Sequence, residues 1–158
     1  MQLLLWCYFH FQSVGRALRK DFMKKILVID DNRDAADMLA AILEFDGHFV
    51  SVAYGARAGL ISVSAIEPEI VFLDIGMPEL NGYEVAVKIR ELPLTRQPCL
   101  IAFTAWSDPD CIEKVKRAGF NQHVTKASSI EALRAVIKGV SLRDRDAERL
   151  VTEWLGGL

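Results

Sequence analysis

Short, continuously apolar runs alternate with segments of helical periodicity from residue 25 to about residue 140. This alternation predicts repeated strand–helix units, in which helices cover both faces of a parallel sheet. Five units can be counted. Their predicted strands are Ile26–Ile29, Phe49–Ala53, Ile70–Leu73, Leu100–Phe103 and a weaker one at His123–Thr125. The pattern therefore predicts an α/β fold with one domain over residues 23–140.

The segments between the strands carry apolar residues three or four positions apart, which is typical of amphipathic helices that pack on a sheet. Turn residues such as Gly47 and Gly119 separate the units. The residues predicted to face the sheet are Ala35, Met38, Leu39, Ile42 and Leu43, then Ile112, Val115 and Ala118, and finally Ile130, Leu133 and Ile137.

Residues 1–22 begin with the apolar and aromatic stretch MQLLLWCYFHF, but no basic residue precedes it and no small-residue cleavage site follows it. A bilayer span needs about 20 apolar residues, so we expect neither a membrane span nor a signal peptide. Met23 before Lys24 and Lys25 is typical of a natural start. Residues 1–22 are therefore interpreted as an extension outside the domain, derived from an upstream start codon or an expression vector. The alternative is an amphipathic anchor on a membrane or partner.

Residues 141–158 form a second segment outside the predicted domain, with apolar side chains on one helical face: Ala147, Leu150, Val151, Trp154 and Leu155. We interpret this segment as an amphipathic helical tail. It either packs on its own domain, as an extension of the last helix, or offers a surface to a partner or a second copy.

The composition narrows the class of protein. The chain has 158 residues, 51% hydrophobic and 25% charged, with a net charge of -2. Such a chain has no general basic field, so direct nucleic-acid binding is disfavoured. Its three cysteines, at widely separated positions, fit neither a disulfide framework nor a CxxC metal site. We therefore expect reduced thiols and a cytoplasmic protein.

Polar residues follow the predicted apolar strands. Asp30 and Asp31 follow the first, Asp74 the third, Thr104 the fourth and Lys126 the fifth. The carboxyl ends of parallel strands meet at one edge of a sheet, where ligands bind. Alone, each residue would be interpreted as a helix cap or turn former. Two carboxylates about 4 Å apart repel by roughly 4 kcal/mol at an effective dielectric near 20, so three of them require a cation. Mg²⁺ suits such oxygen ligands, and a carboxylate beside it can attack phosphorus.

These residues lie in motifs that resemble the receiver domains of bacterial two-component response regulators: ILVIDDN, VFLDIGMPELNGYEV, IAFTAW and HVTKAS. The resemblance covers about residues 24 to 140. Paired Asp, D-x-x-M-P-x-x-N-G, T-A and Lys in this order form a highly specific combination. The resemblance implies a flavodoxin-like, doubly wound, five-stranded parallel sheet of order 2-1-3-4-5, as in the chemotaxis receiver.

The resemblance also implies a role for each matching residue. Asp74 matches the phosphoacceptor, which also contacts Mg²⁺, while Asp31 matches a direct Mg²⁺ ligand and Asp30 a carboxylate that acts through metal-bound water. The remaining matches are Gly76 as a backbone-carbonyl ligand of the metal, Thr104 and Lys126 as phosphate-contacting switch residues, and Ala105 as a small residue that leaves the phosphoryl group room.

The implied partners are a histidine kinase or a histidine phosphotransfer protein as phosphoryl donor, and a downstream protein target. Phosphorylation would shift an equilibrium that is sensed on the fourth helix, fifth strand and fifth helix, a surface that also allows a homodimer. Too little chain follows residue 140 for an output domain, so we expect a stand-alone regulator that signals by protein contact. It would catalyse only its own phosphorylation and dephosphorylation.

The chain departs from the family pattern at three places. Ala127 stands where the family usually has a proline after a cis bond, and a cis bond before a non-proline residue costs roughly 3 to 4 kcal/mol. Either the site accepts that strain or the bond is trans. His123 occupies the position of the switch aromatic, where an ordinary strand residue is the alternative. Trp106 and Gly76 lie at positions that tune water access, and we expect Trp106 to prolong the phosphorylated state.

Two other functions remain open from the sequence. A metal-dependent phosphatase with an aspartyl nucleophile would have a second aspartate two residues later, but Gly76 stands there. A binding module with a vestigial pocket is the other alternative, chiefly because of Ala127. A receiver segment from a hybrid histidine kinase would have the same sequence pattern.

Overall fold

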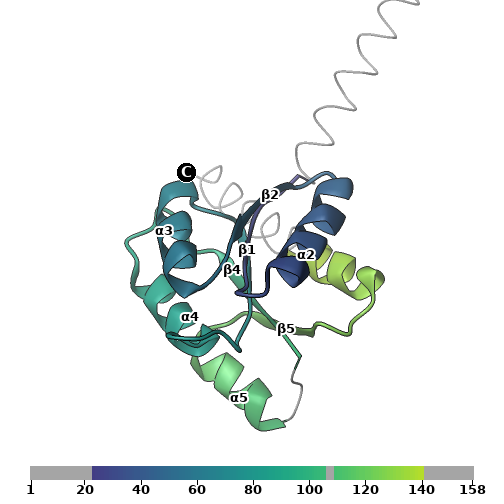
Figure 1. Ribbon diagram of the computed structural model, residues 1–158. Helices are drawn as coiled ribbons and strands as arrows, with labels where there is room; N and C mark the ends of the chain where they lie inside the picture. The colour runs from purple at the N-terminus through teal and green to yellow at the C-terminus, as the bar shows by residue number, and fades with distance from the viewer. Residues whose placement is uncertain (1–22, 106–108, 141–158) are drawn as a thin grey trace, which may run out of the picture.

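A five-stranded, fully parallel sheet forms the centre of the protein in a computed structural model that describes residues 23–105 and 109–140 (Figure 1). Its strand order is β2-β1-β3-β4-β5, so the predicted flavodoxin-like order is confirmed. The strands are β1 (Lys25–Ile29), β2 (Phe49–Ala53), β3 (Ile70–Leu73), β4 (Cys99–Thr104) and β5 (Gln122–Thr125). The predicted bounds of β2 and β3 match, β1 and β5 begin one residue earlier than predicted, and β4 is one residue longer at each end.

Helices cover both faces of the sheet. They are α2 (Arg33–Phe45), α3 (Ala56–Ile66), α4 (Gly82–Glu91), α5 (Pro109–Arg117) and a helical stretch over residues 130–140. Apolar residues of α3, α4 and α5 share one core with the sheet, whereas those of α2 and 130–140 share a second core on the opposite face. The strands feed both cores because successive side chains point to opposite faces.

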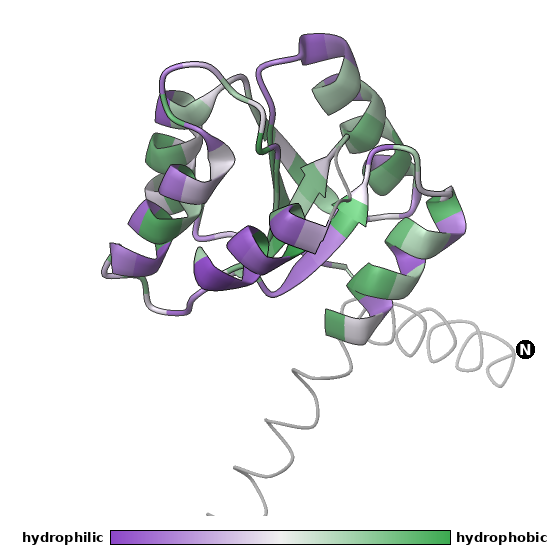
Figure 2. Cartoon of the chain, turned by 90° about the horizontal axis from the view of Figure 1, so that it is seen from below, coloured by the Kyte–Doolittle hydropathy of each residue, from purple (hydrophilic) through white to green (hydrophobic). Residues whose placement is uncertain are grey.

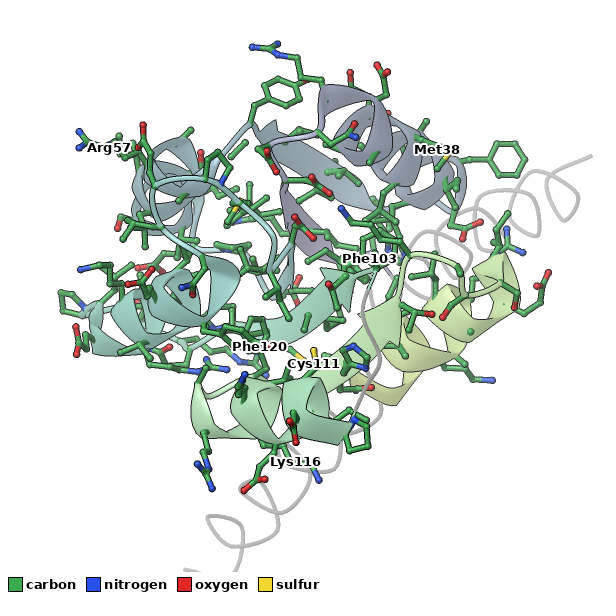
Figure 3. The ribbon with its side chains drawn as sticks, turned by 60° about the horizontal axis from the view of Figure 1, so that its bottom comes forward. Met38, Arg57, Phe103, Cys111, Lys116 and Phe120 are labelled. Atoms are coloured by element: carbon green, nitrogen blue, oxygen red, sulfur yellow. The ribbon has the colours of Figure 1, made fainter. Side chains whose placement is uncertain are left out.

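The buried face of each helix is narrower than its apolar stripe. Met38 is 65% exposed and points outward from α2, and Ile112 and Ile130 are 37% and 40% exposed, so their predicted packing on the sheet is wrong (Figure 3). In α2 the small residues Ala36 and Ala40 are buried instead. Together with Leu39 and Leu43 these alanines form one helical face, and Met38 lies outside it. Several helices are accordingly banded in both hydropathy colours (Figure 2).

Within the described residues, no helix is long and apolar enough to cross a bilayer. The two flanking segments, residues 1–22 and 141–158, lie outside the described residues. Their interpretation as an extension and as an amphipathic tail therefore stays a prediction.

A polar cluster joins the starts of the first three strands. The Lys24 ammonium lies 2.7 Å from a Glu69 carboxylate oxygen, and the Lys24 backbone N–H donates to Nδ1 of His48 at 3.3 Å. His48 is half-buried, and this burial lowers its pKa below the ordinary value. Because Nδ1 accepts the hydrogen bond from Lys24, it must remain unprotonated for this bond to persist.

The lowered pKa of His48 predicts a loss of stability in mild acid. The unfolded chain takes up the proton first as the pH falls below about 6.5, so stability is fully present above that pH and declines toward the folded-state pKa. His48→Asn keeps an acceptor but cannot titrate. Urea unfolding at about pH 7.5 and 5.5 should show a smaller acid-induced loss for the variant than for the wild type. Equal losses would contradict this role of His48.

Candidate functional site

Three carboxylates meet at the carboxyl ends of β1 and β3. Asp30, Asp31 and Asp74 each place an oxygen within 4.8 Å of the others. Asp30 and Asp74 are buried and Asp31 is exposed. The sheet fixes their backbones, because the Asp74 N–H donates to the Ile29 carbonyl at 2.9 Å and the Asp30 N–H to the Ala53 carbonyl at 3.2 Å. The strand pairing therefore brings together the acidic side chains that were predicted to converge.

The start of α2 orients Asp30. The Asn32 backbone N–H donates to Oδ1 of Asp30 at 2.9 Å, while the Asn32 side chain accepts from the Ala35 N–H at 3.1 Å and caps the helix. Asn32 was not among the predicted site residues. Its position one residue before a helix was the available signal, because asparagine is a preferred N-cap.

The start of α4 packs against the backbone of Asp74, the predicted phosphoacceptor. Asn81 and Glu84 form a reciprocal capping box, which the N-x-x-E spacing could have indicated. Gly82, which follows Asn81, donates from its backbone N–H to the Ile75 carbonyl at 3.0 Å. A Cβ at Gly82 would lie only 2.3 Å from the backbone oxygen of Asp74. Glycine is thus required here by the close backbone contact. Gly76, whose backbone carbonyl is a predicted ligand of the metal, is exposed on the loop that follows Asp74.

Lys126 bridges two of the carboxylates. Its Nζ lies 2.7 Å from Oδ2 of Asp30 and 3.1 Å from Oδ1 of Asp74. The backbone N–H of Lys126 donates to the Thr104 carbonyl at 2.8 Å, which extends the pairing of β4 and β5 by one step. The Lys126–Ala127 bond is trans, since no peptide bond among residues 23–105 and 109–140 is cis. The lysine therefore reaches the acidic cluster with a trans bond before Ala127.

Burial and the neighbouring charges shift the pKa values of Asp74 and Lys126. Burial raises the pKa of Asp74, and Asp30 raises it further against the opposing effect of Lys126. Burial alone would lower the pKa of Lys126, but the two carboxylates together raise it. The pKa of Asp74 is thus raised mainly by burial, whereas that of Lys126 is raised by the two carboxylates that surround its ammonium. Three carboxylates this close together fit Mg²⁺, which prefers hard oxygen ligands.

The other predicted residues lie around this cluster. Thr104 is buried at the end of β4, and Ala105 after it is exposed. His123 lies on β5 beside Ala102 and is partly exposed. Because its neighbour Val124 packs in the core with α2, His123 points to the face that α5 covers. Trp106 lies outside the described residues, so its effect on water access stays a prediction.

The family model for the response regulator receiver domain matches residues 26–138. The chain belongs to this family. A similar curated protein is the uncharacterized 14.6 kDa protein in the sodA1 3′ region of Leptolyngbya boryana, which is 36% identical over 112 residues that make up 70% of this chain and 86% of the relative.

Solved receiver structures are similar as well. The receiver domain protein (CheY-like) of Methanospirillum hungatei JF-1 has a TM-score of 0.72 at 25% identity, over 79% of this chain and 98% of its own. The chemotaxis protein CheY4 of Vibrio cholerae has a TM-score of 0.70 at 22% identity, over 75% and 98%, which supports the fold alone. The protein is therefore a receiver domain with the CheY-like fold.

The raised pKa of Asp74 gives a prediction for the metal-free receiver. Stability that depends on Asp74 is greatest below the unfolded-state pKa of 3.8 and is lost as the pH rises through the folded-state value. Above the folded-state value the ionised carboxylate therefore destabilises the fold. Asp74→Asn, which is neutral and of similar shape, should raise the urea midpoint in the presence of a chelator. A lower midpoint than that of the wild type would show that ionised Asp74 stabilises the fold.

Proposed function

We propose that this receiver accepts a phosphoryl group on Asp74 and signals through protein contact. The proposal is supported chiefly by one observation: the Asp74 carboxylate lies in contact with the Lys126 ammonium and beside two further carboxylates. A buried carboxylate beside an ammonium group and two carboxylates that could hold a metal ion has the arrangement that aspartyl phosphate formation requires.

In the proposed reaction an Asp74 oxygen attacks the phosphorus of the donor. The new O–P bond gives an aspartyl phosphate, and the bond from phosphorus to the donor nitrogen or oxygen breaks, with the electron pair leaving on the donor. Asp30, Asp31, Asp74 and the Gly76 carbonyl are the residues that would hold Mg²⁺. When bound, Mg²⁺ supplies the positive charge that neutralises the carboxylates and the transferred group.

Lys126 and Thr104 have separate tasks in this proposal. The Lys126 ammonium contacts Asp74 directly and so lies where it can stabilise a phosphoryl oxygen on that side chain. Thr104 ends the neighbouring strand, and its hydroxyl is proposed to donate to a second phosphoryl oxygen and so to sense phosphorylation. The small side chain of Ala105 leaves space beside them.

The donor in this proposal is a phosphohistidine on a histidine kinase or phosphotransfer protein in the cytoplasm. The phosphorylated state would be recognised on α5, β5 and residues 130–140 by a protein target or a second copy. His123 lies within that surface. We propose no turnover of an external phosphomonoester, because Gly76 replaces the acid–base aspartate of the phosphatases with an aspartyl nucleophile.

Acetyl phosphate provides a direct test of acceptance. The purified chain should gain one phosphoryl mass in the presence of acetyl phosphate and Mg²⁺, and the gain should disappear with a chelator or with Asp74→Asn. Intact-protein mass spectrometry measures all three samples. If the wild type gains no mass under these conditions, the vestigial binding module becomes the better account.

A further inference from the structure

The turn after β5 is closed by two hydrogen bonds between its ends. The Ser128 backbone N–H donates to the Thr125 carbonyl at 2.9 Å, and the hydroxyl oxygens of Thr125 and Ser128 lie 2.8 Å apart. Both residues are half-buried, whereas Ala127 between them is exposed. A side chain–side chain bond thus joins the end of β5 to the third residue after it, and Lys126 lies inside the closed turn.

The closed turn defines where the Lys126 side chain starts. On one side the Lys126 N–H is bonded to the Thr104 carbonyl of β4, and on the other side Thr125 and Ser128 hold the chain that leaves the strand. From this point the Lys126 ammonium reaches Asp30 and Asp74. A lysine has a long flexible stem, so its placement depends on a fixed backbone position. Neither hydroxyl touches the carboxylates in the bonds described, so their effect on the site would act through Lys126.

We propose that the Thr125–Ser128 hydroxyl pair positions Lys126 for phosphoryl transfer to Asp74. This inference rests on the proposed function of Asp74 and extends it to two residues of the HVTKAS motif to which the family resemblance assigns no role. Thr125 and Ser128 are positioning residues. They keep the turn closed while the adjacent Ala127 contributes no hydroxyl or other polar side-chain group.

The neighbouring serine provides a matched control. The Ser129 hydroxyl accepts from the Ala132 N–H at 3.3 Å and so belongs to the start of the helical stretch over residues 130–140. Ser129→Ala therefore removes a hydroxyl one residue away without opening the turn. Ser128→Ala and Ser129→Ala together separate a turn-specific effect from a general loss of helix stability.

The test measures phosphorylation with acetyl phosphate at saturating Mg²⁺ in the full chain. Ser128→Ala and Thr125→Val should each slow Asp74 phosphorylation by about tenfold, because small displacements of a catalytic group have large kinetic effects. The double variant should be no slower than either single variant, since both lose the same bond. Ser128→Thr keeps the hydroxyl and should restore the rate, and Ser129→Ala should match the wild type.

Two further readouts exclude general damage to the fold. Amide hydrogen exchange at positions 126 and 128 should become faster in Ser128→Ala and remain slow in Ser129→Ala. Calorimetric Mg²⁺ affinity should be no weaker in Ser128→Ala than in the wild type, because a less firmly held ammonium competes less for Asp30. A damaged pocket would instead bind Mg²⁺ more weakly, and that result would overturn the inference.

The possible failures are distinguishable. If the wild type is phosphorylated on Asp74 but Ser128→Ala reacts as fast as the wild type, the positioning role is wrong and the proposed function stands. Equal slowing by Ser128→Ala and Ser129→Ala would also overturn the positioning role. If the wild type itself is not phosphorylated, the proposed function fails.

Discussion

Gly82→Ala should destabilise the receiver by about 3 kcal/mol, at the upper end of the usual effect of overpacking. The added Cβ would lie 2.3 Å from the backbone oxygen of Asp74 and 2.7 Å from Cα of Ile75. Both contacts are with backbone, so no side chain can rotate away to relieve them. The start of α4 or the end of β3 must shift, and a shift of β3 moves the Asp74 carboxylate. We therefore expect slower phosphorylation together with the lower urea midpoint.

Gly139 provides the matched control for this substitution. It lies in the helical stretch over residues 130–140. Apart from its two chain neighbours and the nearby backbone of its own helix, a Cβ there would have no atom within 4 Å. Gly139→Ala should be neutral or stabilise the fold by up to about 1 kcal/mol, because alanine is the better helix former. Similar stabilities for the two variants would show that the close contact at Gly82 relaxes without cost.

Lys126→Ala should slow phosphorylation of Asp74 by about 100-fold or more, which is the usual effect of removing one group that stabilises transition-state charge. The same variant should bind Mg²⁺ more tightly than the wild type. Both effects follow from the position of the ammonium, which contacts Asp74 at 3.1 Å and Asp30 at 2.7 Å. In the metal-free protein the ammonium is paired with carboxylates that Mg²⁺ would otherwise bind, so its removal eliminates a competitor.

Lys88→Ala is the control for general charge effects, because Lys88 is exposed on α4 and the substitution removes the same formal charge. It should leave both the phosphorylation rate and the Mg²⁺ affinity near the wild-type values. Stopped-flow measurement of phosphorylation and calorimetric titration of Mg²⁺ give the two quantities. Weaker Mg²⁺ binding by Lys126→Ala would contradict the competition between the ammonium and the metal.

The strands could be predicted because a strand that is buried on both faces is continuously apolar in sequence. All four residues of β3 are fully buried, and the sequence there is continuously apolar. The helices were harder, because apolar residues extend beyond the buried face. Met38 lies next to Leu39 in the same apolar run, but the buried face of α2 includes Ala36 and Ala40 and leaves Met38 in solvent.

The site could be predicted as far as topology determines it. Parallel strands carry Asp30 and Asp74 to one edge, so the position of these residues after apolar runs was sufficient. The contacts that depend on loop geometry were not accessible in the same way. The bond from Asn32 to Asp30 and the contact between Gly82 and Asp74 both depend on the angle at which a helix leaves the loop. Neither hydrophobic periodicity nor residue type determines that angle.

The central claim is that Asp74 itself becomes phosphorylated, and reductive trapping tests it most directly. Borohydride converts an aspartyl phosphate to homoserine, and peptide mass spectrometry then locates the modified residue. After treatment with acetyl phosphate and Mg²⁺, we predict homoserine at Asp74, with Asp30 and Asp31 unchanged. Homoserine at Asp30 or Asp31, or none in the chain, would contradict the assignment of Asp74 as the phosphoacceptor.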